Sequence, residues 1–138
     1  MPERLRRYVF FSQLASPEHL SRTAESFQRV RVFAKAHEIT GILVFDGAFF
    51  CHYLEGPDIW VRTLVAAIAI DERHTNMTPL VDDELPGERL FRTWSMAFTT
   101  QDIVDELRVF EDLRGQDSVD RLIQLLPSLD GCAASLHA

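Results

Sequence analysis

Histidine and cysteine side chains can bind a metal ion and can carry out acid–base and nucleophilic chemistry. The candidate metal ligands are His37, His52, His74 and Cys51. Cys51 and His52 are neighbours in an apolar run expected to be a strand, so their side chains point to opposite faces and cannot readily share one site. The sequence has no CxxC or HExxH motif, and its six glycines occur singly rather than in a phosphate-binding loop. We therefore expect no metal site, no catalytic residues and no enzymatic activity.

His52 lies on one face of a predicted β-hairpin that spans residues 39–56. Residues 39–45 and 48–54 are its strands, and Asp46-Gly47 is typical of a two-residue type I′ turn. Alternation places Phe50, His52 and Leu54 on one face and Phe49, Cys51 and Tyr53 on the other. Since both faces are largely apolar, we expect other elements to cover each side of the sheet. His52 is then either a functional group or a core histidine hydrogen-bonded within the protein.

The rest of the chain predicts the elements that must position this hairpin. Further strands are expected at residues 8–12, 77–81 and 90–98, with a loop at 82–88 and helices at about 16–37 and 57–74. Pro79 cannot donate a ladder hydrogen bond, so the strand at 77–81 is expected at a sheet edge. The order β-α-β-β-α-β, followed by one more strand, predicts an α+β ferredoxin-like sandwich with both helices on one face.

The C-terminal part predicts the cover for the second sheet face. Apolar residues recur at helical spacing over residues 102–114 and 118–126, with Gly115 between them and Pro127 at the end. We therefore divide the chain into a ferredoxin-like domain at 1–100 and a helical extension of the same domain at 101–130. Residues 131–138 are expected to be a disordered tail.

Composition limits the environment and the partners. The formal net charge of −7 argues against nucleic acid as the main partner, because binding to phosphates needs a basic surface. No apolar run reaches membrane-spanning length, and the N-terminus lacks the apolar segment of a signal peptide. Cys51 and Cys132 lie far apart in the sequence, which favours reduced thiols. We expect a soluble, cytoplasmic, single-domain protein with neither a nucleic-acid nor a membrane partner.

Four short motifs occur in one ordered set: ITGIL at 39–43, LEG at 54–56, DERH at 71–74 and WSM at 94–96. With this set, the sequence over about residues 5–100 resembles the BLUF family, the blue-light sensors that use flavin. The resemblance implies the ferredoxin-like fold already predicted here. It also implies FAD or FMN as cofactor, with the isoalloxazine ring between the two helices and against the sheet.

The resemblance also implies a set of cofactor-binding positions, here Phe10, Phe33, Ala34, His52, Arg73, His74, Trp94 and Met96. Family photochemistry uses a tyrosine where this chain has Phe10 and a glutamine where it has His52. Phe10 has no phenolic proton, and a neutral imidazole offers one donor and one acceptor but not the geometry of an amide. The asparagine pair that holds the polar edge of the ring falls on Phe33 and Ala34. Losing two or three of these hydrogen bonds would lower flavin affinity by a factor of roughly 10² to 10⁴.

Three interpretations follow from these departures. The first is a BLUF-like sensory or regulatory domain that acts through protein–protein contacts and has lost normal flavin photochemistry. The second is a blue-light photoreceptor domain that still binds FAD, with altered photochemistry. The third is a pocket reused for another small ligand, or for a pH or redox signal sensed through His52. In each case a protein partner or self-association is expected, with the C-terminal helices or the sheet face of Phe49 and Tyr53 as the interface.

Overall fold

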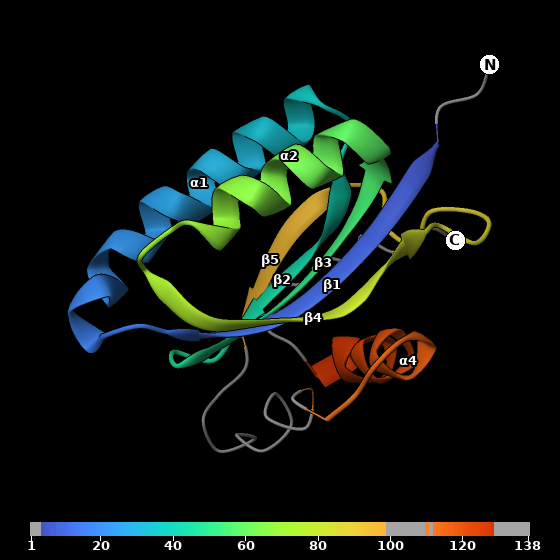
Figure 1. The fold of residues 1–138 in the computed structure, drawn as a ribbon. Helices are drawn as coiled ribbons and strands as arrows, with labels where there is room; N and C mark the ends of the chain where they lie inside the picture. The colour runs from blue at the N-terminus through green and yellow to red at the C-terminus, as the bar shows by residue number, and fades with distance from the viewer. Residues whose placement is uncertain (1–3, 99–109, 111, 129–138) are drawn as a thin grey trace.

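The fold is a three-layer sandwich, seen in a computed structural model that describes residues 4–98, 110 and 112–128 (Figure 1). Helices α1 (Leu20–Ala36) and α2 (Asp58–Ala69) cover one face of the sheet, and α4 (Gln116–Leu125) covers the other. A short 3₁₀ turn, η1 (Pro17–His19), precedes α1, and a second, η4 (Leu126–Ser128), follows α4. The predicted helix at 102–114 lies mostly outside the described residues, as does the tail at 131–138.

The described part of the sheet has five strands. They are β1 (Leu5–Leu14), β2 (Thr40–Phe45), β3 (Phe49–Pro57), β4 (His74–Glu84) and β5 (Trp94–Phe98). Their spatial order is β4-β1-β3-β2-β5. Neighbours are antiparallel except for β5, which runs parallel to β2. This arrangement confirms the predicted ferredoxin-like α+β fold with one additional strand, and it confirms that the strand carrying Pro79 lies at an edge.

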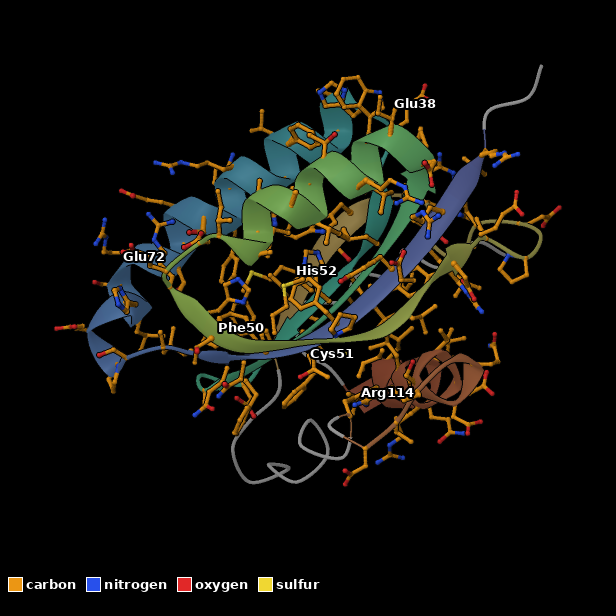
Figure 2. All side chains as sticks on the ribbon, viewed as in Figure 1. Glu38, Phe50, Cys51, His52, Glu72 and Arg114 are labelled. Atoms are coloured by element: carbon orange, nitrogen blue, oxygen red, sulfur yellow. The ribbon has the colours of Figure 1, made fainter. Side chains whose placement is uncertain are left out.

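Strand alternation divides the core into two clusters, as predicted. Phe10, Phe50 and Leu54 are buried between the sheet and helices α1 and α2. Cys51 and Tyr53 are buried between the sheet and α4. Figure 2 shows Cys51 on the side opposite to His52. Tyr53 is fully buried within the single chain, so this part of the second sheet face is not an exposed interface.

The predicted type I′ turn at Asp46-Gly47 is wrong. Gly47 has a φ of 97°, but Asp46 does not have the positive φ that a type I′ turn also requires. Instead, the Asp46 carboxylate accepts hydrogen bonds from the backbone N–H groups of Ala48 and Phe49, at 2.8 and 2.7 Å. An Asx-type turn of this kind closes the loop through a side chain.

Strand β4 is longer than predicted because charge pairs extend it. It reaches Glu84 through acidic residues that were expected to form a loop. Arg6 on β1 pairs with Asp82 at 2.5 Å, and Arg7 pairs with Asp83 at 2.6 Å. These cross-strand ion pairs hold the acidic stretch against β1.

Strand β5 begins at Trp94 rather than at Leu90, so the prediction of a single strand over 90–98 is wrong. Leu90 packs with the α4-side cluster, whereas Trp94 packs on the α1 and α2 side. The second helix likewise ends at Ala69, and residues 71–73 form the turn into β4. At the first helix, the Ser16 side chain makes no capping hydrogen bond, and the 3₁₀ turn η1 comes before α1.

Candidate functional site

The candidate site is built on a cross-strand pair between β1 and β3. Phe10 and His52 are register partners, and their ring centroids lie 5.3 Å apart in an edge-on arrangement. Both side chains are almost fully buried on the sheet face that α1 and α2 cover. The labelled His52 in Figure 2 points from the sheet toward these helices. The two positions that the sequence pointed to are therefore in contact.

His52 receives a hydrogen bond from β5. The indole Nε1 of Trp94 donates to Nε2 of His52 over 2.9 Å. Nε2 is therefore the acceptor, which places the proton of the neutral ring on Nδ1. Burial, with a smaller contribution from the nearby His74, lowers the pKa of His52 to about 3. His52 is a neutral, hydrogen-bonded core histidine across the physiological pH range.

A cavity of about 70 Å³ lies beside this pair. Phe10, Ser12 and His52 form its sheet side, and Phe27 and Ile68 contribute from the helix side. Ser12 is 1% exposed, and its hydroxyl has no hydrogen-bond partner among the described residues. For comparison, an engineered apolar cavity that binds benzene in another protein has a volume of roughly 150 Å³, about twice that of this cavity.

An adjoining groove of about 280 Å³ runs between α1 and α2. Its lining and that of the cavity share Ser26, Val30, Ile68, Asp71 and Arg73. Phe33 and Ile68 line it, but Phe10 and His52 do not. Phe33 packs against His37 and Trp60, with ring centroids 4.4 and 6.2 Å away. Ala34 is fully buried in the core. Neither side chain can hydrogen-bond a ligand, so the two predicted polar-edge positions offer only apolar surface.

Arg73, in the turn between α2 and β4, and His74, the first residue of β4, also line the cavity. The Arg73 guanidinium donates to the Ser26 hydroxyl and lies 3.6 Å from the Asp71 carboxylate. The His74 ring contacts the backbone carbonyl of Ile68 near the C-terminus of α2. Its centroid is 6.1 Å from that of Phe10.

The structure thus brings together only part of the predicted set. Phe10, His52, Arg73 and His74 line the cavity, and Trp94 reaches it through His52. Met96 lies elsewhere, in a groove between α1 and β5. Sequence reasoning missed Ser12, although strand alternation puts it on the same face as Phe10, two residues earlier.

Two general properties complete the description. Within the described residues, no group of three or more His, Cys, Asp or Glu side chains could hold a metal ion. Over the same part of the chain, no helix combines the length and the apolar character that crossing a membrane requires.

Comparison with known proteins places these observations in context. The sequence model of the family described as BLUF, sensors of blue-light using FAD, matches residues 5–97. Over 52 residues the chain is 42% identical to the blue light- and temperature-regulated antirepressor BluF of Escherichia coli strain K12, a match that covers 38% of this chain but 13% of that protein.

Solved structures with the same fold include the BLUF protein BlrB in its dark state and BlsA in its ground state. BlrB has a TM-score of 0.70 and 23% identity, covering 90% of this chain and 96% of that one. BlsA has a TM-score of 0.68 and 22% identity, covering 88% and 87%. A bacterial light-regulated adenylyl cyclase matches with a TM-score of 0.65 and 21% identity, over 88% of this chain but 36% of the cyclase.

Proposed function

Because the chain belongs to the BLUF family of blue-light sensors, we propose that it is a non-catalytic sensory or regulatory domain that acts through protein–protein contacts. In this proposal it works without the family's usual flavin photochemistry. The observation that carries the proposal is the Phe10–His52–Trp94 arrangement. A phenyl ring stands in the position expected for the photoactive tyrosine. The acceptor nitrogen of the imidazole across from it already bonds an indole N–H.

Tyr8, the tyrosine closest in sequence to Phe10, does not take over the role of the photoactive tyrosine. Tyr8 lies two residues earlier on β1, and its register partner is Leu54 rather than His52. Its ring centroid is 6.2 Å from that of Phe10. Burial also raises the pKa of the Tyr8 hydroxyl, which disfavours the loss of its proton. Tyr8 is therefore a poor source of a proton at His52.

The residues of the site do not fit an isoalloxazine ring placed against this pair. The ring has three fused cycles, whereas the cavity beside Phe10 and His52 is about 70 Å³. The larger groove adjoins this cavity, but neither Phe10 nor His52 lines it. Phe33 and Ala34 supply no donor to the carbonyl and imide groups of a flavin. A desolvated ligand group left without its partner costs roughly 1–3 kcal/mol.

The relatives support output through other proteins. The Escherichia coli relative is an antirepressor. Two of the similar solved structures are a bacterial light-regulated adenylyl cyclase and Klebsiella pneumoniae BlrP1 in a calcium and cyclic-diGMP complex. This chain covers 36% of the cyclase chain and 33% of the BlrP1 chain. For this chain we propose signalling by contact with a partner protein.

Restoring the family's polar groups tests the proposal. The variant combines Phe10→Tyr, His52→Gln, Phe33→Asn and Ala34→Asn, and the binding of FMN and FAD is measured by quenching of flavin fluorescence. We expect weak binding by the wild type and an affinity roughly 10² to 10⁴ higher in the variant, because two or three hydrogen bonds are regained. The thermal melting temperature of each protein confirms that the compared samples are folded.

The matched control places asparagines at Val32 and Lys35, two exposed positions on the same helix. This control should leave flavin binding unchanged. Wild-type protein purified with a flavin that survives desalting would contradict the proposal. An unchanged affinity in a folded four-residue variant would contradict the assignment of these positions to the flavin edge.

A further inference from the structure

The largest groove described lies on one flank of the molecule, between α1 and the edge strand β5, and has a volume of about 520 Å³. Its apolar lining, called here the α1–β5 groove, consists of Leu20, Ala24 and Phe27 with Phe45, Met96 and Phe98. We propose that this groove is the docking site for an amphipathic helix with an acidic polar face, carried by a partner protein. The inference rests on the proposed role in protein contacts and names the chemistry of the partner.

The shape and exposure of the groove suit a helix. Leu20 and Phe98 are 48% and 49% exposed at its two sides, although both are large and apolar. On α1 the lining residues recur at three- and four-residue intervals, so they form one stripe along the helix axis. A helix that lays its apolar face into such a groove would bury these side chains through its own i, i+3, i+4 and i+7 residues.

The charge of the groove favours the binding of a helix with acidic side chains. Arg31 lines it, with its guanidinium carbon 5.7 Å from the centroid of the Trp94 ring. None of the described lining residues is Asp or Glu. Arg22 and Arg29 of the same helix line other grooves, so Arg31 is the cation among the described residues that line this one. Acidic side chains on a docked helix would meet complementary charge at Arg31, in a groove whose described lining has no carboxylate and in a protein with a net charge of −7.

Two other occupants fit less well. In a two-fold dimer formed through this groove, the same patch faces itself, so both copies of Arg31 would share the interface with no acidic residue from the described lining. Among the described residues after Phe98, Phe110 is fully buried in the cluster on the opposite face of the sheet. Beyond Phe98, none of the described residues lines the groove.

The test uses a display library of amphipathic helical peptides with randomised polar faces, selected against the full-length protein. We expect enrichment of peptides with acidic polar faces. Phe98→Asp and Leu20→Asp should each weaken the selected peptides by about tenfold or more. Arg31→Glu should weaken acidic peptides and favour lysine-bearing versions of the same sequences. Ile70→Asp is the matched control, since Ile70 is 82% exposed outside the groove and should have no effect.

Several outcomes would overturn the inference. One is selection of peptides without acidic character, or equal binding to the Phe98→Asp variant. Another is a concentration-dependent dimer that Phe98→Asp abolishes, which would assign the groove to a second copy. A third is faster hydrogen exchange over residues 99–109 in Leu20→Asp, which would assign it to the chain itself. Peptide binding does not depend on light, so its failure is distinguishable from failure of the proposed function.

Discussion

His52 is a buried imidazole whose protonation links stability to pH. Its pKa is lowered from 6.5 to about 3 in the folded protein, mainly by desolvation and then by His74. Above pH 6.5 the ring is neutral in both the folded and the unfolded states, so its full contribution to stability is present. Below pH 6.5 the unfolded state takes up a proton that the folded state does not, and stability falls as the pH drops toward 3.

The predicted size of this effect is measurable. Between pH 6.5 and pH 5, one such group lowers the free energy of unfolding by about 2 kcal/mol. Urea unfolding of wild type and His52→Gln at pH 7 and pH 5 should show this extra loss in the wild type only. Equal losses in the two proteins would mean that His52 is not the neutral buried group described.

At the scale of single residues, the sequence predicted which residues form the site but not the hydrogen bonds between them. Strand alternation was enough to predict that His52 shares a face with Phe50 and Leu54, and the family resemblance implied that this face lies toward the helices. The Trp94–His52 hydrogen bond joins residues 42 positions apart and depends on β5 lying parallel to β2, which no local pattern indicates. The size of the cavity also follows from how Phe27 and Ile68 pack, and packing cannot be read from spacing.

At the scale of elements, Glu55 holds the segment that leads into β5. It is fully buried, and its carboxylate accepts hydrogen bonds from the Thr40 and Tyr53 hydroxyls at 2.8 and 3.0 Å. The backbone N–H groups of Leu90 and Phe91 also donate to it, each at 2.8 Å. A buried charge with this many donors is well satisfied. It fixes the chain just before the strand that carries Trp94.

We predict that Glu55→Ala lowers the free energy of unfolding by about 3 kcal/mol, because several buried donors lose their acceptor. Glu88→Ala, in the segment that leads to Leu90 and Phe91, is the control, and since Glu88 is exposed we expect a change within about 0.5 kcal/mol. Chemical unfolding followed by tryptophan fluorescence measures both. Equal losses of stability in the two variants would contradict the role of the Glu55 hydrogen bonds in holding this segment.

The structure explains why the ITGIL motif has a glycine at position 41, which the sequence alone did not reveal. Gly41 has a φ of 151°, and a Cβ there would come within 2.0 Å of the Tyr53 carbonyl oxygen. The strand boundaries were harder to predict for a related reason. Cross-strand charge pairs lengthened β4, and the Glu55 hydrogen bonds kept Leu90 and Phe91 out of β5. Both effects depend on tertiary partners rather than on local propensity.

At the scale of the whole molecule, the need to cover two apolar sheet faces was predictable from the hairpin. α1 and α2 pack on one face, and the α4 residues Val119 and Leu122 are buried against the other. The sequence also predicted that C-terminal helices of the same chain cover the second face. It did not indicate the groove between α1 and β5, where Leu20 and Phe98 are exposed.

The most direct test of the central claim is a light-minus-dark visible spectrum of the whole protein, purified in the dark and saturated with FMN or FAD. With Phe10 and His52 at the photoactive positions, we predict no red shift of the flavin band under blue light and no slow recovery in the dark. The matched comparison is the folded variant carrying Phe10→Tyr, His52→Gln, Phe33→Asn and Ala34→Asn. A reversible red shift in the wild type would contradict the account.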